Sequence, residues 1–284
     1  MLSASLDGVE LTTLRYPLLA SPKLDGIRCI IWDGVAYSRN GKPLRNRFVQ
    51  SWAANHHNLD GEIIVGDPTD RLCLNRTHAV MAFEGEPAFA LYLFDRPDGV
   101  GKFKDRLFEV TKDYVDEPRI IPVVHEMVFT PLDLITAESK YLALGYEGIM
   151  LRDPVGPHKN GYSTLREGWL MKLKRFTDGE AIVTGLEPAM ENRNELQQDE
   201  MGYAKRSTHV ENLVPKDMIG TIICHDVKWG ELRVAPGTMT HDERIALWKH
   251  PTSIVGKAIH WRSFGYGVKD RPRFARYFGI REDQ

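Results

Sequence analysis

The sequence predicts an α+β fold in two parts, with a boundary near residue 175. Segments with strand and helix patterns are interspersed upstream of this point, without the regular strand–helix–strand repeat of a doubly wound sheet. Downstream, short strand patterns predominate and one helix is expected. The length of 284 residues allows two ordinary domains. We therefore place the domains at residues 1–175 and 176–284.

The first part begins with a predicted hairpin. Ile27–Trp32 and Val35–Tyr37 are strand-like, and Asp33-Gly34 between them is typical of a type I′ turn. Further strands are expected at residues 59–65, 89–94, 119–129 and 148–151. Helical spacing is found at residues 104–117 and 132–144, and Gly145 is a suitable stop for the second helix.

The second part has the pattern of a small barrel. Strands are expected at residues 181–186, 218–225, 231–235 and 257–261. The helix from Thr240 to Lys249 begins with a capping box, Thr240 and Glu243. About five strands and one helix favour an OB-fold β-barrel. The polar stretch at residues 188–216 is expected to be a long loop, which in a compact domain is usually functional or disordered.

Composition excludes several classes of protein. Hydrophobic residues make up 42% and charged residues 27% of the chain, which is ordinary for a globular protein and unlike a disordered one. No apolar run is long enough to cross a membrane, and no secretory signal begins the chain. The three cysteines are isolated, which argues against a disulfide framework. These features predict a cytoplasmic protein, in a bacterium or a phage-infected host, without a membrane partner.

The charge is nearly balanced but unevenly distributed. The formal net charge is −2, which by itself argues mildly against a nucleic-acid-binding protein. However, basic residues cluster at Lys23, Arg28, Arg39, Lys42, Arg45 and Arg47, and again at Lys257, Arg262, Lys269, Arg271, Arg273, Arg276 and Arg281. Two such clusters suggest localised anion binding, although either cluster taken alone favours solvated surface.

The most informative segment is Lys23-Leu-Asp-Gly-Ile-Arg28, and the chain has no phosphate-binding loop of the Gly-x4-Gly-Lys-Ser/Thr type. A lysine followed by a turn and a strand is held at the mouth of a sheet. Lysine becomes a nucleophile when burial or nearby cations disfavour its charged form. Alone, the segment is equally compatible with a surface turn.

Four further segments strengthen the case for chemistry. Glu62 lies in an apolar strand, Phe94-Asp95 ends another strand, and Glu147 begins a third. Lys172 and Lys174 lie two residues apart and therefore face the same side of a strand. Each feature singly fits a structural salt bridge, but five in this order are not expected by chance.

Together these segments resemble the covalent nucleotidyltransferases, the superfamily of ATP-dependent DNA ligases, RNA ligases and mRNA capping enzymes. The order K-x-D-G, S-R-x-G, D-G-E, F-D, E-G and K-x-K runs from Lys23 to Lys174. The segment Ser38–Asn46 and the ending Arg271–Asp283 are most similar to the small, phage-type DNA ligases. The resemblance implies an adenylation (nucleotidyltransferase) domain followed by a C-terminal OB-fold domain.

The resemblance also implies residue roles around ATP. Lys23 would attack the α-phosphate to form lysyl-AMP, and Asp25 would help orient it. Arg28, Lys172 and Lys174 would contact the phosphates. Glu62 would contact the ribose, and Phe94 would stack on adenine. Glu147 and Glu62 would bind Mg²⁺, which Mn²⁺ could replace. Arg276 and Arg281 would meet the triphosphate, although they lie further apart than is usual in the family.

The expected activity is sealing of 3′-OH/5′-phosphate nicks in duplex DNA, in replication, repair or recombination, by a monomeric enzyme. The resemblance implies that Arg39 binds the 5′-phosphate. We expect Arg45 to contact the DNA as well. We further expect Lys205 and Arg206 to bind the DNA backbone. Two alternatives stay open: an RNA ligase or capping guanylyltransferase, and a non-enzymatic DNA-binding module.

Overall fold

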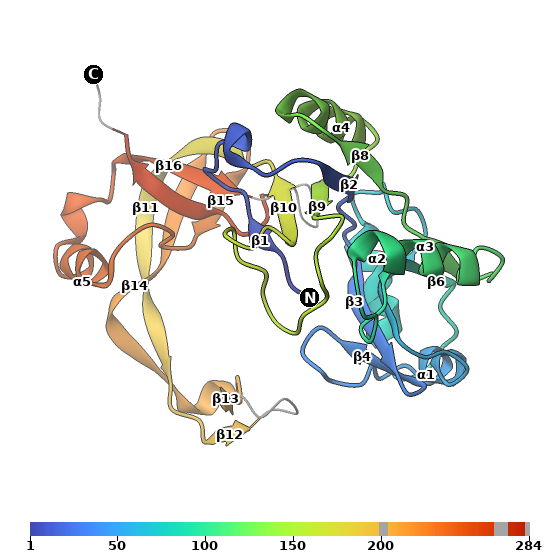
Figure 1. The fold of residues 1–284 in the computed structure, drawn as a ribbon. Coiled ribbons are helices and arrows are strands. Elements are labelled where there is room, and N and C mark those ends of the chain that lie inside the picture. The colour runs from blue at the N-terminus through green and yellow to red at the C-terminus, as the bar shows by residue number, and fades with distance from the viewer. Residues whose placement is uncertain (199–203, 264–271, 282–284) are drawn as a thin grey trace. The chain divides into compact units, whose positions relative to one another are not determined.

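The computed structural model describes residues 1–198, 204–263 and 272–281. The chain divides into two compact units, residues 1–174 and residues 175–284. Strands and helices are mixed in both units, which confirms the α+β class (Figure 1). Single turns of 3₁₀ helix occur at Leu11–Thr13, His78–Met81, Val210–Asn212 and Pro251–Ser253.

The first unit contains two five-stranded sheets. One, here called the β9–β10 sheet, has the order β1 (Ala4–Ser5), β10 (Leu170–Lys174), β9 (Gly148–Arg152), β2 (Leu18–Pro22) and β8 (Glu126–Val128). The other, called the β5–β6 sheet, has the order β4 (Val35–Ser38), β3 (Ile27–Trp32), β5 (Leu59–Val65), β6 (Phe89–Asp95) and β7 (Ile120–Pro122). Each sheet packs its own apolar core.

Four helices accompany these sheets: α1 (Arg47–Ala53), α2 (Cys73–Thr77), α3 (Phe103–Tyr114) and α4 (Pro131–Ala143). The two longer helices, α3 and α4, match the segments with helical spacing. Gly145, with a φ of +99°, follows the end of α4 as expected. Asp33 and Gly34 have φ values of +48° and +75°, which confirms the type I′ character of the β3–β4 turn.

The prediction of one strand over residues 119–129 was wrong. This segment forms two short strands that belong to different sheets, because β7 pairs with β6 and β8 pairs with β2. Pro122 ends β7, and proline lacks the N–H needed to continue a ladder. The segment therefore connects the two sheets of the unit.

The second unit is a curled antiparallel sheet with the order β15 (Gly230–Val234), β14 (Leu213–Asp226), β11 (Thr177–Asn192), β16 (Ala258–Ser263) and β17 (Arg276–Ile280). A parallel bridge between Ala235 and Arg276 joins its two edges. Helix α5 (His241–Lys249) follows β15 and begins with the predicted capping box of Thr240 and Glu243. In the described part of this unit, the five-stranded curled sheet, helix α5 and this bridge agree with the expected OB-fold.

The predicted loop at residues 188–216 is largely a β-structure instead. Strands β11 and β14 remain paired as far as Asn192 and Leu213. Beyond them, β12 (Leu196–Gln198) pairs with β13 (Ala204–Arg206). Figure 1 shows β11 and β14 leaving the curled sheet as a long two-stranded arm with β12 and β13 near its end. We call residues 188–198 and 204–216 the β-arm. Its polar sequence misled the prediction because both faces of this ladder are solvated.

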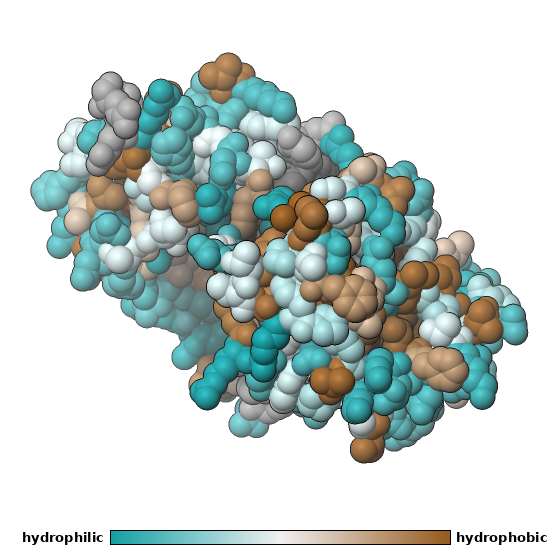
Figure 2. Space-filling model, turned by 45° about the horizontal axis from the view of Figure 1, so that its top comes forward, coloured by the Kyte–Doolittle hydropathy of each residue, from teal (hydrophilic) through white to brown (hydrophobic). Residues whose placement is uncertain are grey.

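Within the described residues, no helix is both long and apolar enough to cross a membrane. On the face shown in Figure 2, hydrophobic side chains are scattered among hydrophilic ones. Scattered exposed apolar residues of this kind are normal on a globular protein.

Candidate active site

Lys23 lies where the chain passes from one sheet of the first unit to the other. It directly follows β2, and its backbone N–H donates to the carbonyl of Gly148 at 2.9 Å. Three residues later, Gly26 precedes β3 and approaches β5 so closely that a Cβ would lie 2.3 Å from the Ile63 carbonyl oxygen. The K-x-D-G segment is therefore a tight crossover that requires glycine and fixes the backbone of Lys23.

Glu147 connects two of the predicted lysines. Its Oε2 lies 2.5 Å from Lys23 Nζ, and its Oε1 lies 2.8 Å from Lys174 Nζ. Burial acts to raise the pKa of Glu147, but the attraction of the two ammonium groups holds that pKa below its ordinary value. Glu147 is therefore a carboxylate at neutral pH.

Lys172 and Lys174 come from the same face of β10. Burial lowers the pKa of Lys174, against the attraction of Glu147. Burial also lowers the pKa of Lys172, and repulsion from Lys23 and Arg39 adds to the effect. A group of cations that repel one another is suited to bind a polyanion, because the anion relieves the repulsion.

Glu62, on β5, faces the same crossover. Its Oε1 accepts a hydrogen bond from the Gly26 backbone N–H at 3.2 Å. Burial raises the pKa of Glu62 to about 7, although Arg28 and Lys23 act to lower it. A carboxyl group that is half protonated at neutral pH can both donate and accept hydrogen bonds, as a ribose hydroxyl requires.

Arg28 and Phe94 form a second group on the β5–β6 sheet. The Arg28 guanidinium binds Asp60 through two hydrogen bonds of 2.5 Å and lies 4.7 Å above the Phe94 ring. Asp60 was not among the site residues predicted from the sequence. A charged residue that interrupts the apolar run Leu59–Val65 is the signal that could have found it, since a buried acid requires a partner.

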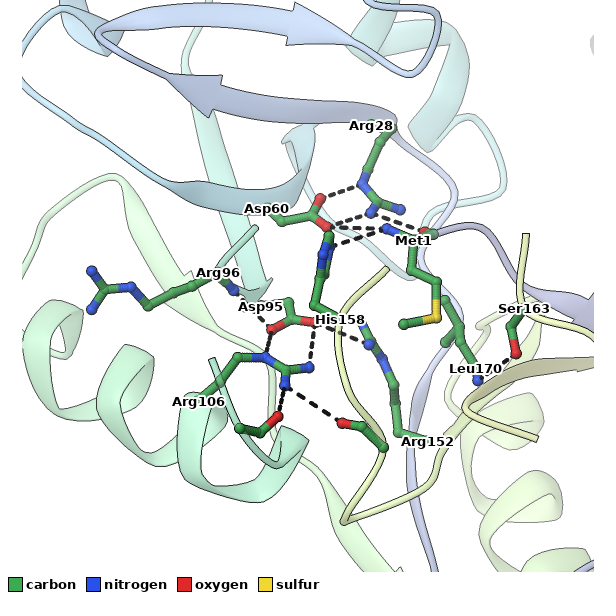
Figure 3. Close-up of polar contacts among 12 residues, drawn as sticks. Met1, Arg28, Asp60, Asp95, Arg96, Arg106, Arg152, His158, Ser163 and Leu170 are labelled. Carbon is green, nitrogen blue, oxygen red and sulfur yellow. Dashed lines mark hydrogen bonds and ion pairs between the residues drawn. The ribbon is translucent and has the colours of Figure 1, made fainter. Parts of the chain in front are cut away.

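A third group joins the two sheets around Asp95, which the sequence placed at the end of a strand but without its partners. Asp95 at the end of β6 accepts from Arg106 of α3 at 2.8 Å and pairs with Arg152 of β9 at 3.0 Å (Figure 3). All three side chains are at most 4% exposed. Burial acts to raise the pKa of Asp95, but the two guanidinium groups lower it to about 2. This ion-paired group ties the strand that carries Phe94 to the strand that begins after Glu147.

The predicted DNA-binding residues of the first unit are exposed. Arg39 lies in the turn after β4, and its Nη2 donates to the hydroxyl of Tyr162 at 2.9 Å. Arg45 is exposed seven residues after β4. Tyr162 had no place in the sequence-based site.

A metal site is only partly formed by protein groups. Among the described residues, no three His, Cys, Asp or Glu side chains gather closely enough to hold a metal ion. Glu147, as a carboxylate, offers hard oxygen ligands of the kind Mg²⁺ prefers, and Mg²⁺ commonly takes its other ligands from substrate phosphates and water. The residues present therefore fit a substrate-assisted metal site at Glu147, whereas the raised pKa of Glu62 makes it a poorer ligand.

The predicted residues of the second unit lie on two separate elements. Lys205 and Arg206 are adjacent on β13, so they face opposite sides, and Arg206 donates to the Asn194 carbonyl. Arg276 is exposed at the start of β17, and Arg281 pairs with Glu180 at 2.5 Å. Lys269, Arg271 and Asp283, which belong to the predicted basic cluster and closing motif, lie outside the described residues.

Comparisons of the sequence and of the structure both find proteins named as DNA ligases. No family model matches the sequence. The chain is 24% identical over 268 residues to a protein of Haemophilus influenzae named DNA ligase, covering 91% of this chain and 84% of that protein. It is similar to the structure of Chlorella virus DNA ligase-adenylate, with 27% identity, a TM-score of 0.53, and coverage of 99% of this chain and 98% of that one. A structure from a study of Lig E DNA ligases has the same fold, with a TM-score of 0.70, 20% identity, and coverage of 99% and 98%.

Proposed function

We infer that the chain is an ATP-dependent DNA ligase, which joins a 3′-hydroxyl to a 5′-phosphate through a covalent adenylate on the protein. The observation that carries this inference is that Lys23 and Lys174 both contact Glu147, at 2.5 and 2.8 Å, beside a glycine-dependent crossover. A nucleophile, a carboxylate and neighbouring cations in one place are what nucleotidyl transfer to a lysine requires.

In the first step, Lys23 Nζ attacks the α-phosphorus of ATP and pyrophosphate leaves. The ammonium loses one proton to solvent before the attack, and the amine loses a second as the phosphoramidate (P–N) bond forms and the bond to the pyrophosphate oxygen breaks. The attack uses the neutral amine, so the contact between Nζ and Glu147 is exchanged for the contact with phosphorus. Lys172 and Lys174 neutralise charge on the phosphates during the transfer.

Adenosine is held on the β5–β6 sheet. Phe94 stacks on adenine, a contact worth about 1–3 kcal/mol in base–aromatic systems. Glu62 hydrogen-bonds the ribose, which its raised pKa supports. Arg28, fixed by Asp60, supplies positive charge beside the nucleotide and holds the Phe94 ring.

The remaining steps take place on DNA. The 5′-phosphate of the nick attacks the adenylate and releases Lys23, and Asp25 helps position the groups for this transfer. The 3′-hydroxyl then attacks the activated 5′ end, and AMP leaves. Arg39 binds the 5′-phosphate, because a guanidinium can bind it in a bidentate manner, and Arg45 contacts the neighbouring DNA backbone.

Mg²⁺ is the proposed metal, with Glu147 as its protein ligand, and it would stabilise charge on the transferred phosphoryl group. We assign residues 1–175 as the adenylation domain and residues 176–284 as the OB-fold domain. Arg276 and Arg281 are its proposed triphosphate contacts. A nicked duplex bound by a monomer is the proposed substrate complex.

Label transfer tests the proposed function. Incubation with α-³²P-labelled ATP and Mg²⁺ should label the protein covalently, and the label should be absent from Lys23→Ala but present in Lys140→Ala, which removes an exposed lysine paired with Glu126. The labelled protein should then seal a nicked DNA duplex. Labelling from GTP instead, or sealing restricted to RNA, would point to a capping enzyme or an RNA ligase. Nick binding without labelling would point to a non-enzymatic module.

A further inference from the structure

The contact between Arg39 and Tyr162 brings together two segments separated by 123 residues. Arg39 Nη2 donates and the phenolic oxygen of Tyr162 accepts, at 2.9 Å. A phenol that accepts in this way still has its own O–H to donate. The pair therefore presents two kinds of donor side by side, a guanidinium and a hydroxyl.

Tyr162 is held by its backbone and exposed by its side chain. Leu2 pairs with it in a parallel bridge, and the Leu2 backbone bonds to Gly161 and Ser163 on either side, both at 2.8 Å. The side chain is nevertheless 60% exposed. The phenol is therefore held in place and accessible to a ligand, on a loop segment of the kind that often carries binding residues.

Arg39 is held in a comparable way. It lies in a turn closed by the Ser38 N–H to the Lys42 carbonyl at 2.8 Å and the Gly41 N–H to the Ser38 carbonyl at 3.0 Å. Its charge contributes to the lowered pKa of Lys172, as does that of Lys23. Ser163, the residue after Tyr162, accepts from the Leu170 N–H at 3.1 Å, so the Arg39–Tyr162 pair is tied to the start of β10, the strand that carries Lys172 and Lys174.

We propose that the Tyr162 hydroxyl is a second donor to the 5′-phosphate of the nick, acting together with Arg39. The inference rests on the proposed function, since it assigns a residue to the DNA steps of that reaction. Arg39 supplies charge, and Tyr162 supplies both a hydrogen bond to the phosphate and a fixed position for the guanidinium. A phosphate bound in this way faces the adenylate on Lys23.

A thermodynamic cycle between protein and DNA tests this role. Parent and Tyr162→Phe proteins are first converted to lysyl-AMP and then bound, in EDTA, to two duplexes that differ only in having a 5′-phosphate or a 5′-hydroxyl at the nick. The parent should prefer the phosphorylated nick, and Tyr162→Phe should lose about 10-fold of that preference, the value expected for a hydrogen bond to a charged group. Binding to the 5′-hydroxyl nick should change little.

Tyr114→Phe, on α3, is the matched control and should keep the parent's preference. Equal weakening of both duplexes, or an unchanged preference in Tyr162→Phe, would overturn the proposal. A Tyr162→Phe protein that cannot form lysyl-AMP would place the hydroxyl in the ATP step and overturn it as well. Failure of the parent itself to become adenylylated would instead contradict the proposed function.

Discussion

Glu62 and Glu147 ionise differently because their neighbours differ. Two lysines contact Glu147 and keep it charged, whereas Glu62 is buried and its pKa rises to about 7. The ordinary pKa of Glu62, 4.5, applies to the unfolded chain. Between these two values the folded state binds a proton that the unfolded state has lost. The contribution of Glu62 to stability is therefore fully present below the unfolded value and is lost as the pH rises through about 7.

Glu62→Gln should remove this pH dependence and keep the acceptor for the Gly26 N–H. We expect the unfolding free energy of the parent to fall, relative to that of Glu62→Gln, by up to about 3 kcal/mol between about pH 4.5 and pH 8. Urea unfolding of both proteins over this range measures the difference. Parallel pH profiles would contradict the expectation, and the comparison cancels the effect of other titrating groups such as His125, whose pKa burial lowers to about 4.

At the level of secondary-structure elements, one buried carboxylate, that of Asp95, links strands β6 and β9. Asp95 pairs with Arg106 and Arg152, and the three side chains are nearly inaccessible. Breaking such a group by removing one partner is costly, because the remaining charges stay buried without compensation.

Asp95→Asn should therefore lower the free energy of unfolding by about 3–5 kcal/mol, as measured by urea denaturation. The same change at Asp178, an exposed partner of Arg262, should cost no more than about 1 kcal/mol. A loss of unfolding free energy in Asp95→Asn that is no larger than in Asp178→Asn would contradict this expectation.

Helix α5 is stabilised by its N-cap residue, Thr240. The Thr240 side chain accepts from the Glu243 N–H at 3.2 Å, and Glu243 accepts from the Thr240 N–H at 2.7 Å. Thr240→Ala should lower the unfolding free energy by about 1 kcal/mol, measured by thermal or urea unfolding. Thr240→Ser retains the hydroxyl and should restore most of the loss; equal losses in both variants would exclude the cap as the cause.

The elements also show what the sequence could predict. Local patterns located β3, β4, β5 and α5 closely, because turn residues, apolar runs and capping boxes act over a few residues. Short helix α1 and strand β2 were missed, since seven and five residues carry too little periodicity. The division of residues 119–129 between two sheets depends on tertiary pairing, which no local pattern specifies.

The candidate site likewise contains some residues that were predicted from the sequence and others that were not. Lys23, Glu147 and Lys174 were predicted from motifs, and the structure brings them into contact. Lys23 and Glu147 lie 124 residues apart but were found because both belong to motifs. Asp60 and Tyr162 were missed as site residues because their pairing with Arg28 and Arg39 depends on the fold, and no local pattern specifies it.

At the scale of the whole molecule, we propose that the β-arm contacts the DNA backbone through Lys205, Arg206 or both. Lys205 is exposed on β13, whereas Arg206 is partly occupied by the Asn194 carbonyl. The two residues face opposite sides of the strand, so they contact different phosphates or only one of them contacts DNA.

Lys205→Ala should weaken binding to nicked duplex and reduce the slope of log K against log salt by about 0.9, the value for one lost phosphate contact. Fluorescence anisotropy over a salt series measures the slope. Glu195→Ala, which removes an acidic residue of the same arm, serves as the control because it should not reduce the slope. An unchanged slope in Lys205→Ala would exclude this lysine from the DNA contact.

The bridge between Ala235 and Arg276 has a further consequence for the barrel. Along this seam the two edges share few hydrogen bonds: the Ala235 N–H to the Ala275 carbonyl at 2.9 Å, the Tyr277 N–H to the Ala235 carbonyl at 2.8 Å, and the Thr238 N–H to the Tyr277 carbonyl at 3.2 Å. The ladder between β11 and β14 is much longer, although bulges shift its register. Backbone amides at the seam should therefore exchange with deuterated solvent sooner than those of the central ladder, because opening there breaks the least structure.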